Sequence, residues 1–312
     1  MNLPTGFRFR APTWDDVDGV AEVLLDDQRV DGVETTLDGF FLRQVWSRPG
    51  FELASDAWVV TDVAGRIIGY GQATRDEPDT VESWAVVHPE YRGRGIGSSL
   101  FDQLESRAAA LLAGVPSPRF RNSINARDAA AAGIARAHGL RLVRHHWHMQ
   151  IDLDGPVEPR PDPQGISIGG VEVPRDLATI HGILVSAFAE DPGDHPDPFD
   201  RWVEDHVTSP SYDPSLWLLA RAGDVPVGAV TASAGDDGGW VDWLAVLATH
   251  RGRGIGPAML RRSFATFASR GLRRAMVNVD AENVTGATGV YERAGMRVVN
   301  AWDLWEGWST AS

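Results

Sequence analysis

One hexapeptide constrains this chain more than any other feature, because RGRGIG occurs at 92–97 and again at 251–256. Each copy follows an apolar run and precedes a segment with helical spacing. The two copies are 159 residues apart, and the same offset brings other residues into register: Trp58 with Trp217, Gly69 with Gly228, and Trp84 with Trp243. Agreement of several separated patches at one offset indicates an internal repeat.

The repeat divides the chain into two parts. A length of 312 residues suits two domains of ordinary size, and 43% hydrophobic residues suffice for two cores. Between the copies, Ile151–Gly165 is rich in proline and acidic residues, which is typical of a linker. We therefore expect domains at 1–152 and 165–312, joined by a linker at 153–164.

Both copies have the same order of expected elements. A strand and an amphipathic helix come first, followed by a hairpin that turns at Gly65 or at Gly223. A buried strand then leads into the hexapeptide, and a helix with one apolar face follows it. A further strand and helix close the second copy, so the pattern predicts a mixed α/β fold.

Composition excludes several classes of function. The net charge of −14 offers no electrostatic footprint for nucleic acid or for an anionic membrane surface. The absence of cysteine excludes disulfides, thiolate metal sites and a cysteine acyl-enzyme. The first residues lack the apolar core of a signal peptide, and no apolar run could span a bilayer. We expect a cytoplasmic protein without a metal site and without nucleic-acid or membrane partners.

The hexapeptide has the chemistry of a pyrophosphate site. Its glycines allow a tight turn that points consecutive N–H groups into one concavity. The following helix adds the positive end of its dipole, and two arginines add charge-assisted hydrogen bonds. The glycine spacing does not match a Rossmann fingerprint, and the chain has no lysine for a Walker loop.

The strand–RxxGxG–helix element resembles the acyl-coenzyme A loop of the GCN5-related N-acetyltransferase (GNAT) family. The segment DAENVTGATGVYERAGM at 280–296 resembles the closing strand and helix of the same family, and the tandem arrangement resembles mycothiol synthase and related two-domain acetyltransferases. The resemblance implies two GNAT-like domains, each with a mostly antiparallel mixed sheet flanked by helices.

The same resemblance implies acetyl-CoA as the acyl donor. It places the cofactor on both copies, at Val87, Arg92, Gly93, Arg94, Gly95, Ile96 and Gly97 in the first, and at Leu244, Ala245, Val246, Arg251, Gly252, Arg253, Gly254, Ile255, Gly256 and Asn283 in the second. Backbone N–H groups near Leu244–Val246 would stabilise the oxyanion, and pantetheine would lie along the same strand edge.

The family resemblance assigns the general acid to Tyr291. The shared glycines Gly139 and Gly295 define an offset of 156 residues near the end of the copies, which places Ala135 at the equivalent position. The segment around Ala135 contains no tyrosine. We therefore expect catalysis only in the second domain.

A candidate general base is Asp242, a carboxylate inside the apolar run WVDWLAVL. The ungapped offset aligns Glu82 with Val241, so alternation along a strand places Glu82 and Asp242 on opposite faces. A strand-end position exposed to water is an equally good interpretation of Asp242. Asp280 and Glu282 are further candidates, and a first domain that uses Glu82 stays open.

The expected function is transfer of an acetyl group from acetyl-CoA to a primary amine of a small molecule, directly and in the second domain. The acidic segment 188–202, with His195, suits a cationic acceptor or is simply a solvated loop. The alternative is a non-catalytic protein that binds or senses acyl-CoA. Since the repeat already supplies a pseudo-dimer, we expect a monomer or a weak homodimer.

Overall fold

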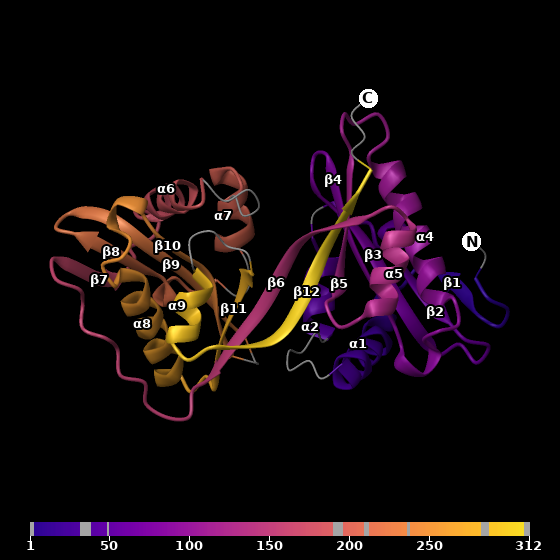
Figure 1. Cartoon of the computed structure of the whole chain (residues 1–312), viewed down its shortest axis with the longest axis horizontal. Helices are drawn as coiled ribbons and strands as arrows, with labels where there is room; N and C mark the ends of the chain where they lie inside the picture. Colours follow the sequence, from indigo (N-terminus) through magenta and orange to yellow (C-terminus); the bar gives the residue numbers. More distant parts are fainter. Residues whose placement is uncertain are drawn as a thin grey trace. The chain divides into compact units, whose positions relative to one another are not determined.

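The computed structural model describes residues 3–31, 39–48, 50–189, 196–208, 212–235, 238–281 and 287–308 (Figure 1). Its contacts group the chain into two compact units. The first contains Met1–His146 together with Asn300–Ser312, and the second contains Trp147–Val299. The last residues of the chain therefore belong with the first unit, although the repeat had grouped them with the second.

The first unit begins with strands and helices in the order expected from the sequence. Its elements are β1 (Arg8–Arg10), the 3-10 helix Trp14–Asp16, α1 (Val17–Asp31), α2 (Gly39–Trp46), α3 (Leu53–Asp56), β2 (Ala57–Thr61), β3 (Ile67–Glu77), β4 (Thr80–Val87), the 3-10 helix Pro89–Tyr91, α4 (Ile96–Leu111), β5 (Arg119–Asn125) and α5 (Ala129–Ala137). The next strand, β6 (Arg141–Asp152), passes from the first unit into the second.

The second unit repeats this order. Its elements are β7 (Ile166–Gly170), α6 (Leu177–Ala187), α7 (Phe199–Val207), the 3-10 helix Pro214–Leu216, β8 (Leu218–Ala222), β9 (Val225–Gly235), β10 (Gly238–Val246), the 3-10 helix Ala248–His250, α8 (Ile255–Ser269), β11 (Arg274–Asp280) and α9 (Ala287–Arg293). The last strand, β12 (Arg297–Gly307), returns to the first unit.

Each unit has a mixed sheet that is mostly antiparallel. The strand order is β1-β2-β3-β4-β5-β12 in the first and β7-β8-β9-β10-β11-β6 in the second. One pair in each sheet, β4 with β5 and β10 with β11, is parallel. The expected hairpins are present as β2–β3 and β8–β9, where Gly65 and Gly223 have positive φ angles of 85° and 61°.

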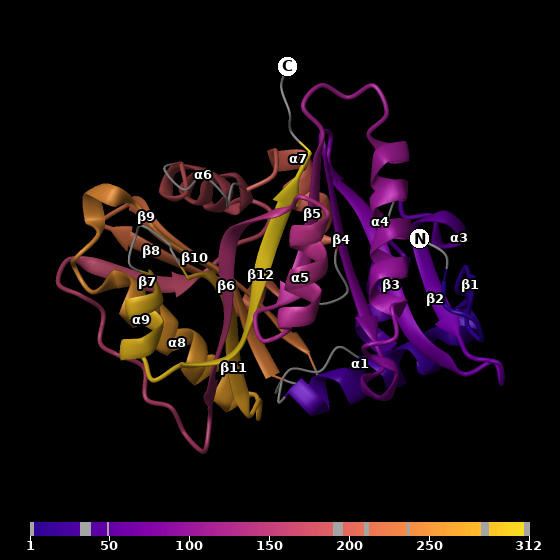
Figure 2. The same cartoon turned by 45° about the vertical axis from the view of Figure 1, so that its right-hand side comes forward.

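The final sheet position of each unit is filled by a strand that crosses between the units. Residues Trp302–Gly307 of β12 pair with β5, while β6 lies beside β11. Neither copy of the repeat therefore completes its sheet with its own last strand. Figures 1 and 2 show β6 and β12 as two long strands.

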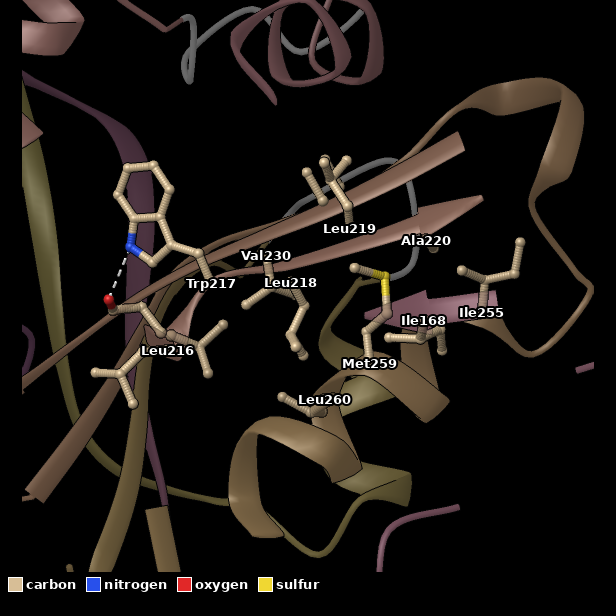
Figure 3. Close-up of a cluster of buried hydrophobic side chains, with 14 of the residues drawn as sticks. Ile168, Leu216, Trp217, Leu218, Leu219, Ala220, Val230, Ile255, Met259 and Leu260 are labelled. Atoms are coloured by element: carbon tan, nitrogen blue, oxygen red, sulfur yellow. Dashed lines mark hydrogen bonds between the residues drawn. The ribbon is translucent and has the colours of Figure 1, made fainter. Parts of the chain in front are cut away.

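Apolar faces of the helices cover the sheets. In the first unit α1 and α2 share a buried cluster with β2 and β3, while Leu100 and Leu104 of α4 belong to separate clusters. In the second unit α8 places Met259, Leu260 and Ile255 near Ile168 of β7 and the residues of β8 (Figure 3). Figure 1 shows α6 and α7 on one side of this sheet and α8 and α9 on the other.

The segment at 153–164 contacts the second unit. Arg261 of α8 donates a hydrogen bond to the carbonyl oxygen of Glu158 (3.1 Å), and Arg262 pairs with Asp162 (3.0 Å). Val157 packs against the apolar core. Within the described ranges, no helix combines the length and apolar character needed to cross a membrane.

Candidate active site

The two hexapeptide loops have the same backbone conformation. Gly93 and Gly95 have φ angles of 75° and 82°, and Gly252 and Gly254 have φ angles of 75° and 79°. Gly95 is the N-cap of α4 and Gly254 is the N-cap of α8. The left-handed region disfavours any side chain, so a repeated glycine at these points fixes the angle at which each helix leaves its strand.

Each loop presents backbone N–H groups that suit a pyrophosphate. The first intrahelical hydrogen bonds run from Ser99 N to Gly95 O and from Ala258 N to Gly254 O, so the preceding N–H groups are available at the helix start. A Cβ atom built on Gly254 meets nothing within 4 Å, whereas one on Gly95 lies 3.5 Å from Pro4. A side chain at the N-cap of either helix would therefore meet at most an ordinary van der Waals contact.

The first arginine of each hexapeptide braces its own loop. Arg92 Nε lies 3.4 Å from the carbonyl oxygen that ends β4, and Arg251 Nε lies 3.2 Å from the one that ends β10. Arg92 also pairs with Asp27 of α1, and Arg251 Nη2 donates to the carbonyl oxygen of Ala187 at the end of α6 (2.8 Å). These contacts hold the loop against the first helix of its unit.

The second arginine of each loop lies on the surface. Arg94 donates to the carbonyl oxygen of Glu90 (3.0 Å) and lies 5.0 Å from the ring centre of Tyr91. Arg253 is exposed and contacts the carbonyl oxygen of Gln164 (3.4 Å). These exposed charges beside the helix start are the ones best placed for a phosphate.

The units differ where the parallel strands separate. In the first, β4 and β5 stay paired as far as Ser83 with Asn122. In the second, the pairing of β10 with β11 ends at Trp240 with Met276. Beyond that point β10 continues to Val246 with no further pair to β11 among the described residues, and this is the stretch expected to hold pantetheine.

Asp242 lies just beyond the last pair of β10 with β11. Val241 pairs with Ala232 and Trp243 pairs with Thr231, so Asp242 is an extra residue in a β-bulge. Over the corresponding stretch of the first unit, β3 and β4 pair without irregularity. Bulges redirect side chains and end regular pairing, which accounts for the earlier separation of β10 from β11.

The bulge corrects the comparison of Glu82 with Val241. Thr74 pairs with Glu82, and Ser233, which is 159 residues after Thr74, pairs with Trp240. Glu82 therefore corresponds to Trp240, and Asp242 has no counterpart in the first unit. An ungapped alignment hides this insertion. The offset between the copies is 159 residues in the preceding strands, at Thr74 and Ser233, and again after the bulge, at Trp84 and Trp243.

The surroundings of Asp242 favour its protonated form. The side chain reaches solvent, but protein atoms surround it on most sides. This burial raises the pKa of the Asp242 carboxyl to about 6, against a smaller opposing effect of the hydrogen bond from Ser233 Oγ (3.0 Å). Such a carboxylate is ionised at neutral pH and basic enough to take a proton.

Tyr291 lies on α9 and is buried in the core of the second unit. Burial raises the pKa of its hydroxyl, which therefore stays protonated through the neutral range. In the first unit the equivalent Ala135 is buried as well. Asn283, Glu282 and His195 lie outside the described residues.

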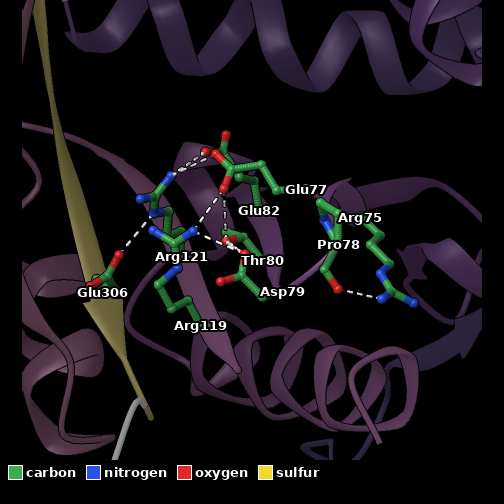
Figure 4. Close-up of polar contacts among 9 residues, drawn as sticks. All are labelled: Arg75, Glu77, Pro78, Asp79, Thr80, Glu82, Arg119, Arg121 and Glu306. Atoms are coloured by element: carbon green, nitrogen blue, oxygen red, sulfur yellow. Dashed lines mark hydrogen bonds and ion pairs between the residues drawn. The ribbon is translucent and has the colours of Figure 1, made fainter. Parts of the chain in front are cut away.

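Ion pairs occupy the corresponding region of the first unit (Figure 4). Arg121 of β5 contacts Glu82 (3.5 Å) and Glu306 of β12 (2.9 Å), and Arg119 contacts Glu77 (2.7 Å) and Asp79. The Arg119 guanidinium lowers the pKa of the Asp79 carboxyl.

Beside this network, the Ser83 hydroxyl donates to the carbonyl oxygen of Arg121 (2.9 Å) and accepts from Asn122 (2.7 Å). Glu82 is thus engaged in an ion pair, and the interior side of the strand is closed by hydrogen bonds. Nothing in the sequence indicated this network, because its members come from four strands, β3, β4, β5 and β12, and from the turn between β3 and β4.

No three His, Asp or Glu side chains lie close enough to hold a metal ion in the parts of the chain that the structure describes. The candidate features of the second unit are the glycine loop, the stretch of β10 beyond its last pair with β11, the Asp242 carboxyl of raised pKa and the Tyr291 phenol in the core. This combination fits an acyl-coenzyme A and a proton-transfer reaction.

Comparison with known proteins identifies the family. A GNAT acetyltransferase family model matches residues 177–296, and a GNAT acetyltransferase domain model matches residues 54–139. Mycothiol acetyltransferase of Streptomyces scabiei is 31% identical over 242 residues, which cover 76% of this chain and 75% of that protein. The chain belongs to the GNAT acetyltransferase family.

Further relatives show how far this GNAT likeness extends. Mycothiol acetyltransferase of Streptomyces griseus is 32% identical over 75% of this chain and 74% of its own length. A GCN5-related N-acetyltransferase from Sphaerobacter thermophilus has 29% identity and a TM-score of 0.86, and covers 98% of this chain and 96% of its own.

A tandem GNAT protein from the clavulanic acid biosynthesis pathway shares the fold, with 17% identity, a TM-score of 0.71, and coverage of 98% of this chain and 99% of its own. The tandem GNAT architecture expected from the repeat is confirmed, and so is the mostly antiparallel mixed sheet of each unit. As a member of this family, the chain is an N-acetyltransferase that uses acetyl-CoA as its acyl donor.

Proposed function

We propose that this GNAT enzyme transfers the acetyl group of acetyl-CoA directly to a primary amine of a small molecule, and that the reaction takes place in the second unit. The observation that carries the proposal is the bulge at Asp242. It ends the pairing of β10 with β11 at Trp240, one residue earlier than the equivalent pairing of β4 with β5, and it inserts a carboxylate of raised pKa that has no counterpart in the first unit.

The loop and the strand edge would hold the donor. The N–H groups at the start of α8 and the exposed Arg253 would bind the pyrophosphate, while Arg251 would keep the loop in place through its contacts with its own unit. The edge of β10 at Leu244, Ala245 and Val246 would bind pantetheine as an added strand. Acetyl-CoA supplies an activated thioester carbonyl.

Two side chains would move protons. The Asp242 carboxylate would accept a proton from the ammonium group of the acceptor, so that the nitrogen lone pair can attack the carbonyl carbon. As the carbon–sulfur bond breaks, the Tyr291 hydroxyl would donate its proton to the leaving sulfur. Its raised pKa keeps that proton available at neutral pH.

The first unit would support the fold without catalysing the reaction. It could still bind acetyl-CoA. Its loop keeps the same glycine conformation, but the place of the tyrosine is taken by Ala135, and Glu82 is paired with Arg121. A calorimetric titration with acetyl-CoA would count the sites, because two working loops give a stoichiometry of two.

The relatives named mycothiol acetyltransferase supply the first acceptor to assay, a mycothiol-related amine. Turnover is measured by chromatography as loss of acetyl-CoA and gain of coenzyme A, because a mycothiol-related acceptor carries a thiol that would itself react with a thiol-directed dye. We expect Tyr291→Phe to retain acetyl-CoA binding and lose most turnover. Undiminished turnover in that variant rejects the acid role, and an absence of acetyl-CoA binding by the native chain rejects the proposal as a whole.

A further inference from the structure

Two polar residues lie on the strands next to the point where β10 separates from β11. Asn278 of β11 is exposed, although β11 lies between β10 and β6 in the sheet. Its side-chain oxygen lies 2.9 Å from Nδ1 of His148 on β6. The His148 ring in turn lies 5.0 Å from the ring of Trp240, the last paired residue of β10 before the bulge.

Strand register places these residues beside the end of the pairing of β10 with β11. Leu153 N donates to Arg273 O between β6 and β11, which puts His148 opposite Asn278 and Asp152 opposite Arg274. The contacts between the side chains of those same pairs agree with this register. Met276, the partner of Trp240, is two residues before Asn278, so Asn278 lies on the same face one step further along, where β10 has already separated.

The first unit is an internal comparison. There the strand pair Glu82–Arg121 corresponds to the pair Trp240–Met276 of the second unit. On its other side, Arg121 pairs with Glu306 of β12. Two residues further along β5 is Ser123, and its partner on β12 is the buried Leu304. The pair Asn278–His148 thus corresponds to Ser123–Leu304, so the unit without a bulge carboxylate also lacks the carboxamide and imidazole.

We infer that Asn278, held by His148, binds an oxygen atom of the acceptor next to the amine that Asp242 deprotonates. The inference rests on the proposed function. Because the hydrogen bond to His148 uses the side-chain oxygen of Asn278, the amino group is the part of the carboxamide left to contact a substrate. An amino group only donates, so its partner must be a hydroxyl, ether or carbonyl oxygen.

This polarity selects a class of acceptor. Amines that carry a hydroxyl or carbonyl oxygen on the neighbouring carbon, such as amino alcohols, amino sugars and amino acid amides, fill both positions. Simple alkylamines and polyamines leave the carboxamide donor without a partner when the substrate excludes water. A buried donor left unpaired weakens binding, whereas a matched oxygen strengthens it.

The test compares two amines that differ by one hydroxyl, trans-2-aminocyclohexanol and cyclohexylamine. Binding to the native full-length protein saturated with coenzyme A is measured by NMR titration, which does not depend on turnover. We expect the amino alcohol to bind about tenfold more tightly than the alkylamine, the effect of roughly one neutral hydrogen bond. In Asn278→Ala this difference should disappear through weaker binding of the amino alcohol alone.

Two further variants separate recognition from folding. Ser123→Ala alters the corresponding position of the first unit and should leave the tenfold preference intact. His148→Phe keeps a ring beside Trp240 but no longer holds Asn278, so we expect an intermediate preference.

Equal binding of the two amines by the native protein, or a parallel loss of both in Asn278→Ala, overturns the inference. Failure of the proposed function has a different signature. In that case the preference for the amino alcohol is present in the binding data, but Asp242→Asn has no effect on acetyl transfer.

Discussion

Replacing Asp242 by asparagine should stabilise the protein at alkaline pH while it removes activity. The protein environment raises the pKa of the Asp242 carboxyl from 3.8 to about 6. Ionisation is therefore less favourable in the folded chain than in the unfolded chain, and above pH 6 it favours unfolding. Asparagine has a similar shape, carries no charge and can still accept the hydrogen bond from Ser233.

The size of the effect follows from the shift. About two pKa units at about 1.4 kcal/mol each give an upper bound of about 3 kcal/mol. Because the Asp242 side chain reaches solvent, screening reduces this to about 1 to 1.5 kcal/mol. For a unit of this size the change corresponds to roughly 2–5 °C in Tm.

The assay is thermal unfolding of native protein and Asp242→Asn across pH. We expect the variant to unfold at higher temperature at pH 8. The difference should shrink as pH falls through 6 and vanish only well below 3.8, where this carboxyl is protonated in both the folded and the unfolded native chain. At pH 8 the same variant should lose about 10²–10³-fold in kcat/KM, the usual contribution of a general base. The reasoning is refuted if the native protein and Asp242→Asn have equal Tm values at both pH 8 and pH 4, or if the variant retains its turnover.

Other expected outcomes concern pH, the acid, the loop and the ion pairs. The kcat/KM of the native enzyme should fall below about pH 6 as Asp242 is protonated, and Ser233→Ala should move that limb to higher pH because it removes a hydrogen bond that lowers the pKa; an unmoved limb contradicts this. Tyr291→Phe should reduce kcat far more than it changes the calorimetric Kd for acetyl-CoA, and equal losses in both would indicate a packing role. Gly254→Ala places a side chain at a φ of 79° and should weaken acetyl-CoA binding about tenfold, with a loss of about 1 kcal/mol in stability; an unchanged Kd contradicts the loop's role. Glu306→Gln leaves half-buried Arg121 with weaker partners and should lower unfolding free energy by about 1 kcal/mol without changing kcat, as measured by denaturant titration and coenzyme A release.

The order of helices and strands could be predicted from the sequence because each pattern occurs in both copies of the repeat. The hydrophobic periodicity, the turn glycines and the hexapeptide each occur twice in the same order, so the order of elements could be predicted for both copies. The loop conformation followed too, since only glycine adopts the positive φ angles found at Gly95 and Gly254 without strain. The alanine at 135, in the place that corresponds to Tyr291, is likewise a property of sequence alone.

The role of Asp242 needed the tertiary structure. In the sequence it is one carboxylate in an apolar run, equally compatible with a strand end. Only the pairing of β9 with β10 shows that it is an inserted residue, and only packing around it shifts its pKa. Pairing is a relation between distant segments, so an alignment of the two copies could not reveal the bulge.

The sheet partners of β12 and β6 also depend on pairing between strands that are far apart in the chain. The first unit completes its sheet with β12 from the end of the chain, and β6 supplies the corresponding strand of the second. Local sequence predicts each strand, because alternation and β-branched residues act within a few residues. Which sheet a strand joins depends on long-range pairing and burial, and that choice brings Glu306 to Arg121 and His148 to Asn278.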